Sequence, residues 1–181
     1  MITLVGLPGS GKSTIGRQLG RRLQLPFVDS DTVIEQRIGC SIRDFFAREG
    51  EDAFRDVEQS VLADLYTAPE TLVIATGGGI VLRAANRACL RGSGTVVYLR
   101  SSPEELARRL RHDTQRPLLQ GVDALQRLRD LYEARDPLYR EVAAFAIDSA
   151  RRSVAMMVST VLMQLELSGW SPGPPPVADS P

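Results

Sequence analysis

The chain has 181 residues, 43% of them hydrophobic, and its 22 basic residues balance 22 acidic ones. This length suits one well-buried domain and is short for two. A formal net charge of zero does not favour binding of nucleic acid or of an acidic membrane surface.

The N-terminal residues and the cysteines indicate where the protein acts. Residues 1–5 run directly into a glycine-rich loop, without the basic and apolar regions of a signal peptide. The apolar stretch 154–167 contains a glutamine and a glutamate and is too short to span a membrane. Cys40 and Cys89 fit no metal-binding spacing, and a reducing compartment is the simple interpretation. We therefore expect a cytoplasmic protein with no nucleic-acid or membrane partner.

A glycine-rich motif follows the first apolar run, 2–5. Residues 6–14 match the phosphate-binding pattern G-x-x-x-x-G-K-[ST] at every fixed position, and apolar residues with helical spacing follow. The glycines let backbone N–H groups turn toward an anion, and the next helix directs its N-terminus at the same anion. Lys12, the only lysine of the chain, would meet the β- and γ-phosphates of ATP, and the Ser13 hydroxyl group would bind Mg²⁺. The expected phosphate-binding residues are Gly9, Ser10, Gly11, Lys12, Ser13 and Thr14. A plain turn between a strand and a helix is the alternative, but it does not require this order of strand, loop, Lys-Ser and helix.

Two carboxylates follow the second apolar run, 25–28. Asp29 and Asp31 stand one residue apart, at the start of a helical segment, 32–38. One interpretation is a helix cap. Beside a bound nucleotide, one carboxylate would instead support Mg²⁺ while the other faces the hydroxyl group of an acceptor. The residues alone leave both interpretations open.

Three consecutive glycines follow the third apolar run, 72–75. Gly77, Gly78 and Gly79 offer backbone N–H groups without side chains in the way, which suits a substrate or a phosphate lying close to the main chain. A plain turn would need only one or two glycines. We therefore expect this run to bind a ligand.

The segment 109–122 is polar and irregular. It indicates a mobile lid that closes over ATP, so that Arg116 reaches the phosphates and Arg109 supports the nucleotide. An ordinary surface loop is the alternative. His112, the only histidine, lies in this segment rather than near the acceptor, and we treat it as solvated.

Short apolar runs alternate with helical segments along the chain. The runs lie at 2–5, 25–28, 72–75, 95–99 and 144–147. This alternation predicts an α/β fold of three layers, α/β/α, with a central five-stranded parallel sheet. We expect one domain over 1–167 and a disordered proline-rich tail over 168–181.

In this order and spacing, the motifs resemble those of the shikimate kinase family, a group of small P-loop proteins. This resemblance implies that the sheet is of the P-loop kinase type. The similarity extends from Met1 to about Leu167. The matching segments are 6–16, 29–31, Phe54-Arg55 with Glu58, 77–79, Arg116-Pro117-Leu118-Leu119 and Arg135-Asp136-Pro137-Leu138-Tyr139. Only the phosphate loop is specific by itself, whereas the combination is highly specific.

The resemblance implies a kinase that transfers the γ-phosphoryl group of ATP to the 3-hydroxyl group of shikimate. Arg55 and Arg135 would clamp the shikimate carboxylate, and Glu58 would hold Arg55 in place. Without the resemblance, surface ion pairs would be the favoured interpretation of both arginines. The backbone of 77–79 would approach the substrate, and Asp31 would accept a hydrogen bond from the reacting hydroxyl group.

For the nucleotide, the resemblance implies that Asp29 serves the Mg²⁺ site together with Ser13, because no acidic residue ends the run at 72–75. Arg152 is the candidate contact for adenine. Substrate binding is placed in 32–62 and the lid in 109–122, in a protein expected to be monomeric. The implied catalytic residues are Lys12, Asp31 and Arg116.

Two other functions compete with this one. A kinase of another small polyol acid, such as gluconate, would share the phosphate loop, but the patterns around Arg55 and at 135–139 argue against it. A non-catalytic P-loop module that binds a nucleotide and signals to a partner is the alternative from a different class. A decayed site usually loses one of four residues that are all present here: Lys12, Ser13, Asp31 and Arg116.

Overall fold

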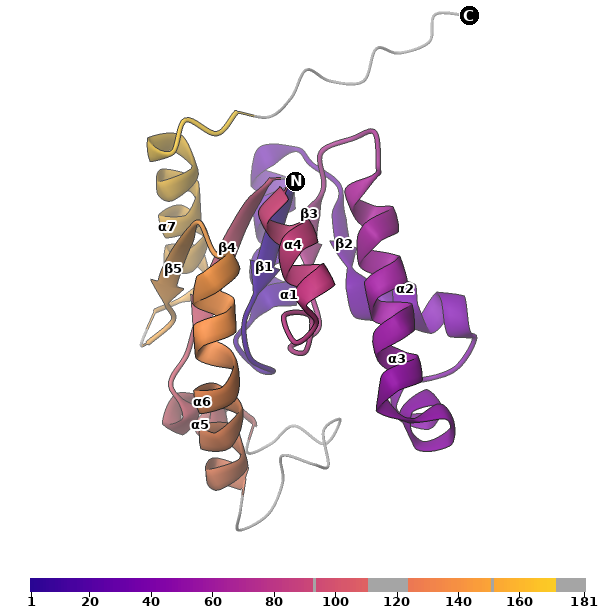
Figure 1. The fold of residues 1–181 in the computed structure, drawn as a ribbon. Helices are drawn as coiled ribbons and strands as arrows, with labels where there is room; N and C mark the ends of the chain where they lie inside the picture. The colour runs from indigo at the N-terminus through magenta and orange to yellow at the C-terminus, as the bar shows by residue number, and fades with distance from the viewer. Residues whose placement is uncertain (93, 111–123, 151, 172–181) are drawn as a thin grey trace, which may run out of the picture.

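The computed structural model describes residues 1–92, 94–110, 124–150 and 152–171, and within them strands and helices alternate along the chain (Figure 1). The strands are β1 (Ile2–Val5), β2 (Phe27–Asp29), β3 (Val73–Ala75), β4 (Thr95–Arg100) and β5 (Phe145–Asp148). The helices are α1 (Lys12–Leu23), α2 (Ser30–Ile38), α3 (Ile42–Tyr66), α4 (Ala84–Gly92), α5 (Pro103–Leu110), α6 (Ala124–Val142) and α7 (Val154–Leu167). None of the helices in these described ranges is long and apolar enough to cross a membrane.

The five strands form one parallel sheet in the order β2-β3-β1-β4-β5, which confirms the predicted fold class. Because the strands are parallel, their carboxyl ends meet at one edge, and the loops after β1, β2 and β3 leave the sheet side by side. The boundaries differ from the expected runs mainly at β2, which begins at Phe27 rather than Leu25. Leu25 N instead donates a hydrogen bond to Gly20 O at 2.9 Å and closes the turn after α1.

Apolar clusters cover both faces of the sheet. Ile2 and Leu4 of β1 belong to the cluster under α1 and α7, whereas Val5 belongs to the cluster on the opposite face. Alternate side chains of a strand point to opposite faces, so this pattern fixes how the sheet sits between its helical layers. The helix residues buried in the first cluster are Ile15, Leu19, Met157, Val158, Val161 and Leu165. Those in the second are Leu62, Leu90, Leu106, Leu110, Leu128, Tyr139 and Val142.

Helices α2 and α3 lie beside the β2 edge of the sheet (Figure 1). Their shared core contains Ile34, Phe54 and Val61. Ser41 caps α3 by accepting a hydrogen bond from Asp44 N at 3.1 Å. Gly50, with φ 84° and ψ 179°, interrupts the helix. The segment after this break carries the side chains that reach the candidate site.

The chain directly after α7 turns back so that Trp170 packs against the protein, although the sequence places it in the tail. Ser168 N and Trp170 N donate hydrogen bonds to the last turn of α7, and Trp170 packs against the cluster under α1 and α7. Gly169 has φ 72°, which turns the chain back toward that cluster. The prediction of a tail beginning at residue 168 is therefore too early by a few residues. Residues 172–181 lie outside the described part.

Candidate active site

The loop between β1 and α1 encloses the ammonium group of Lys12. Lys12 Nζ donates hydrogen bonds to Gly6 O at 2.8 Å and to Leu7 O at 2.9 Å, and the residue is only 8% exposed. Gly9 and Gly11 have φ of 81° and 91°, which glycine adopts without strain. The loop is thus folded around a positive charge at the start of α1, an arrangement that suits an anionic phosphate.

The other predicted phosphate-binding side chains differ in burial. Ser10 is buried, and its Oγ accepts a hydrogen bond from Lys12 Nζ at 3.4 Å. Thr14 is exposed in the first turn of α1. The structure therefore brings Ser10 and Lys12 together inside the loop and leaves Thr14 at the surface.

Ser13 meets the carboxylate of Asp29. Ser13 Oγ donates to Asp29 Oδ2 at 2.6 Å, while Asp29 Oδ1 accepts from Asp31 N at 3.2 Å and caps α2. Asp29 is therefore the cap of α2, and its other carboxylate oxygen contacts the hydroxyl group that was expected at the same Mg²⁺ site. A hydroxyl group and a carboxylate in contact beside a phosphate loop fit Mg²⁺, which otherwise takes phosphate oxygens and water as ligands. Over the described residues, no group of three or more His, Cys, Asp or Glu side chains could hold a metal by itself.

The glycine run 77–79 lies where several elements converge. A Cβ atom on Gly77 would lie 2.7 Å from Asp31 Oδ1 and 3.2 Å from Glu58 Oε1. On Gly78 it would lie 2.9 Å from Pro8 Cδ in the phosphate loop. Only residues without side chains allow these groups to approach so closely.

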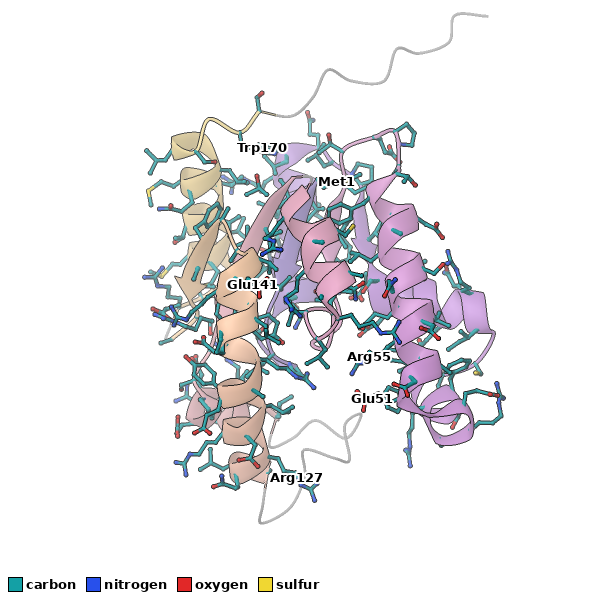
Figure 2. The ribbon with its side chains drawn as sticks, in the orientation of Figure 1. Met1, Glu51, Arg55, Arg127, Glu141 and Trp170 are labelled. Atoms are coloured by element: carbon teal, nitrogen blue, oxygen red, sulfur yellow. The ribbon has the colours of Figure 1, made fainter. Side chains whose placement is uncertain are left out.

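Arg55 reaches the same run from α3. A Cβ atom on Gly79 would overlap with its guanidinium group. Arg55 Nη1 donates to Glu58 Oε2 at 3.0 Å, as the sequence spacing predicts, and Nε and Nη2 donate to Glu51 Oε1 at 3.2 and 2.9 Å. Burial raises the pKa of Glu58, and the positive charge of Arg55 opposes this rise. Figure 2 shows Arg55 and Glu51 on the side of α3 that is turned toward α6.

The carbonyl oxygen of Gly78 connects the glycine run to α6. It accepts hydrogen bonds from Arg135 Nη1 at 3.0 Å and from Tyr139 OH at 2.5 Å. The Tyr139 ring is buried and lies 4.9 Å from the ring of Tyr98 on β4, and burial raises the pKa of its hydroxyl group, so that it stays a donor. Tyr98 OH donates in turn to Asp136 Oδ1 at 2.9 Å. Helix α6 is thereby held between β4 and the glycine run.

Two residues of this arrangement were not assigned a role from the sequence. Tyr139 lies in the motif at 135–139, and its position one helical turn after Arg135 is a signal that could have identified it. Ser30 Oγ accepts a hydrogen bond from Gly77 N at 3.3 Å. Its place between two aspartates gives no comparable signal.

Arg109 and Arg152 meet at the backbone of Ser149, just after β5. Arg109 Nη2 donates to Ser149 O at 3.1 Å and to Glu105 Oε1 at 2.6 Å. Arg152 N donates to the same carbonyl oxygen at 3.3 Å, but its side chain extends along α7 to Thr160 Oγ1 at 3.4 Å. The structure thus brings the Arg109 guanidinium group and the Arg152 backbone to the same carbonyl oxygen, and it directs the Arg152 guanidinium group elsewhere.

Most of the predicted lid, 109–122, lies outside the described residues. Arg116 and His112 are among the residues left out. The part that the structure describes is Arg109 and Leu110 at the end of α5. The role of Arg116 therefore stays a prediction from the sequence.

Comparison with known sequences gives consistent matches over almost the whole chain. The family model for shikimate kinase matches residues 8–166. A shikimate kinase of Paracidovorax citrulli is 60% identical over 178 residues, which are 96% of each chain. One of Ralstonia nicotianae is 52% identical over 180 residues, covering 99% of this chain and 93% of the relative.

Solved structures give the same family and a wider fold group. A shikimate kinase from Acinetobacter baumannii in complex with shikimate has a TM-score of 0.86 and 44% identity, and 93% of each chain is covered. A gluconokinase from Sinorhizobium meliloti has a TM-score of 0.61 and 21% identity, and 92% of this chain and 91% of that chain are covered. The second similarity is one of fold alone.

Proposed function

The chain belongs to the shikimate kinase family, and we propose that its site transfers the γ-phosphoryl group of ATP to the 3-hydroxyl group of shikimate, giving ADP and 3-phosphoshikimate. The observation that carries this proposal is the convergence of two kinds of group on the glycine run 77–79. A phosphate loop with its lysine approaches from one side, and Asp31, Arg55 and Arg135 approach from α2, α3 and α6. A phosphate donor and an alcohol that carries a carboxylate could meet at such a point.

On the donor side, backbone N–H groups of 9–14 and the ammonium group of Lys12 would bind the ATP phosphates. Because Lys12 Nζ already lies inside the loop, little reorganisation is needed. Ser13 and Asp29 would hold Mg²⁺, which when bound neutralises charge on the β- and γ-phosphates.

Three arginines would complete the nucleotide site. Arg109 would support the nucleotide beside the backbone of Ser149, and Arg152 is the proposed contact for adenine. Arg116 would reach the transferring phosphoryl group when 109–122 closes as a lid, and its charge would stabilise the transition state.

On the acceptor side, Arg55 and Arg135 would bind the shikimate carboxylate. Each guanidinium group has five N–H donors, so Arg55 can keep its hydrogen bond to Glu58, and Arg135 has donors beyond the one that Gly78 O accepts, for binding a carboxylate oxygen. The backbone of 77–79 would line the acceptor site. These contacts would orient the 3-hydroxyl group toward Asp31.

The chemical step depends more on the alignment of the acceptor hydroxyl group with the phosphorus than on early removal of its proton. Phosphoryl transfer passes through a loose transition state, so the hydroxyl oxygen must lie in line with the γ-phosphorus before the leaving bond stretches. Asp31 would accept a hydrogen bond from the 3-hydroxyl group and take its proton as the new O–P bond forms and the bond to ADP breaks.

The direct test is a coupled assay of ADP release with shikimate, gluconate and nucleoside monophosphates as acceptors. We expect ADP release that depends on shikimate. ADP release with gluconate and none with shikimate would contradict the proposal. ATP binding without transfer to any acceptor would instead favour a non-catalytic module.

Replacing Gly79 with alanine is expected to raise the KM for shikimate about tenfold or more, because the added methyl group would displace the Arg55 guanidinium group. The KM for ATP should stay within about twofold of the wild-type value. Steady-state kinetics with each substrate varied in turn measures both. Gly92→Ala is the matched control, since nothing lies within 4 Å of a Cβ atom built there. An unchanged KM for shikimate in Gly79→Ala would contradict the role given to Arg55.

We further propose that the protein acts as a monomer in the cytoplasm. Cys40 and Cys89 are free thiols, which fits a reducing compartment. Residues 1–167 would form one catalytic domain, with the acceptor region at 32–62 and the lid at 109–122.

A further inference from the structure

Glu51 covers an edge of the Arg55 guanidinium group that a substrate carboxylate would need. Its single oxygen Oε1 accepts from both Nε and Nη2, the two donors that bind a carboxylate through parallel hydrogen bonds. Elsewhere on the group, Nη1 donates to Glu58, and Gly79 lies so close that a methyl group there would overlap with Nη1 and Nη2. A further carboxylate can therefore bind the Nε–Nη2 edge only by replacing Glu51.

The two carboxylates that contact Arg55 differ sharply in exposure. The Glu58 side chain is 2% exposed, whereas the Glu51 side chain is 59% exposed. Water competes with an exposed ion pair and makes it weak, but removing one partner of a buried pair is strongly unfavourable. A ligand would therefore displace Glu51 and leave Glu58 in place.

Arg55 itself would stay in position during this exchange. Its side chain is only 11% exposed, and its Cζ atom lies 5.9 Å from the ring centre of Phe46 and 5.2 Å from that of Phe54. These rings and Glu58 fix the guanidinium group independently of Glu51. Glu51 is therefore not needed to hold the arginine.

The position of Glu51 follows from the break at Gly50. Glu51 starts the helical segment after the break and lies one turn before Arg55, at the i,i+4 spacing that brings two side chains of a helix into contact. Figure 2 shows both side chains on the same side of α3. Nothing lies within 4 Å of a Cβ atom built at Gly50, so there is open space on that side of the break before Glu51.

We propose that Glu51 is an internal competitor for the acceptor carboxylate: it occupies the Nε–Nη2 edge of Arg55 in the free enzyme and is displaced when the acceptor binds. This inference rests on the proposed function, because it assigns the shikimate carboxylate to Arg55. Its consequence is specificity, since a ligand without a carboxylate cannot replace Glu51 and gains nothing from Arg55.

The test is Glu51→Gln, which keeps the size of the side chain and removes its charge. The KM for shikimate should fall about twofold to fivefold, the factor that corresponds to an exposed ion pair, while kcat and the KM for ATP stay within about twofold. Glu49→Gln is the matched control. It removes the same charge two residues away, but Glu49 pairs with Arg48 at 2.7 Å and does not contact Arg55 in any described hydrogen bond or ion pair.

A second measurement separates displacement from a general change in the site. Binding of shikimate and of its neutral methyl ester is measured by calorimetric titration in each variant. Glu51→Gln should tighten binding of the acid and leave binding of the ester unchanged. An unchanged or raised KM for shikimate in Glu51→Gln would overturn the inference, and so would an equal fall of this KM in Glu49→Gln. In either case, wild-type activity on shikimate would still uphold the proposed function. A wild-type enzyme inactive on shikimate would overturn both.

Discussion

Asp31→Asn is expected to lower turnover by about two to four orders of magnitude, the usual effect of losing a positioned acid or base. Asparagine keeps the shape of the side chain, so it still fits beside Gly77, where Asp31 Oδ1 leaves no room for a Cβ atom. It has no charge, however, and accepts the proton of the acceptor hydroxyl poorly. ATP binding should remain nearly intact, because the phosphate loop is not altered.

Single-turnover transfer in a quenched-flow experiment and nucleotide affinity by titration measure these two quantities on the same variant. Asp29→Asn is the contrasting variant rather than a neutral control, since it removes the neighbouring carboxylate at the proposed Mg²⁺ site, which contacts Ser13 rather than the glycine run. Unchanged transfer in Asp31→Asn would reduce Asp31 to a structural residue of α2. Loss of ATP binding in Asp31→Asn would indicate that Asp31 serves the metal site and that Asp29 accepts the hydrogen bond from the acceptor hydroxyl group.

Lys12→Arg should reduce turnover by about two to three orders of magnitude, the effect of losing one preorganised donor in an active site. The compact ammonium group lies in a space bounded by Gly6 O and Leu7 O, and the residue is 8% exposed. A planar guanidinium group is larger and cannot direct its donors at both carbonyl oxygens and a phosphate from the same place. The positive charge is kept, so a loss of activity would report on geometry rather than on charge.

The converse exchange, Arg17→Lys, provides the control for Lys12→Arg. Arg17 lies on the exposed side of the same helix, with its Cζ atom 5.5 Å from the ring centre of Phe27. This variant should keep wild-type turnover, and thermal melting of both variants shows whether either is misfolded. Near-normal turnover in Lys12→Arg would show that the loop does not bind the transferring phosphate as proposed.

The fold and the local contacts of the site could be predicted because their signals lie close together in the sequence. The phosphate loop identified the first strand and helix, and the alternation of apolar runs identified the remaining strands. The Arg55–Glu58 pair followed from helical spacing, and the structure shows it at 3.0 Å. The glycine run at 77–79 was expected to let a ligand lie close to the main chain. In the structure, side chains from the phosphate loop, α2 and α3 approach this run closely.

Contacts between distant segments could not be predicted in this way. Nothing in the motif at 135–139 says that Tyr139 donates to Gly78, because that contact depends on how α6 packs against β4. Glu51 was also missed, since an exposed glutamate next to a glycine break resembles any surface residue. The packing of Trp170 depends on the turn at Gly169, which the proline-rich composition of the following residues obscures.

The carbonyl oxygen of Gly78 has two donors where one would satisfy it, and this redundancy has energetic consequences. Loss of either Arg135 or Tyr139 leaves the oxygen paired, whereas loss of both leaves it without either donor, so the double substitution should cost more than the sum of the single ones. Single substitutions in α6 therefore understate how firmly this helix holds the glycine run. Because there are two donors, Arg135 can turn its N–H groups toward a carboxylate while the hydrogen bond from Tyr139 still holds the glycine run in place.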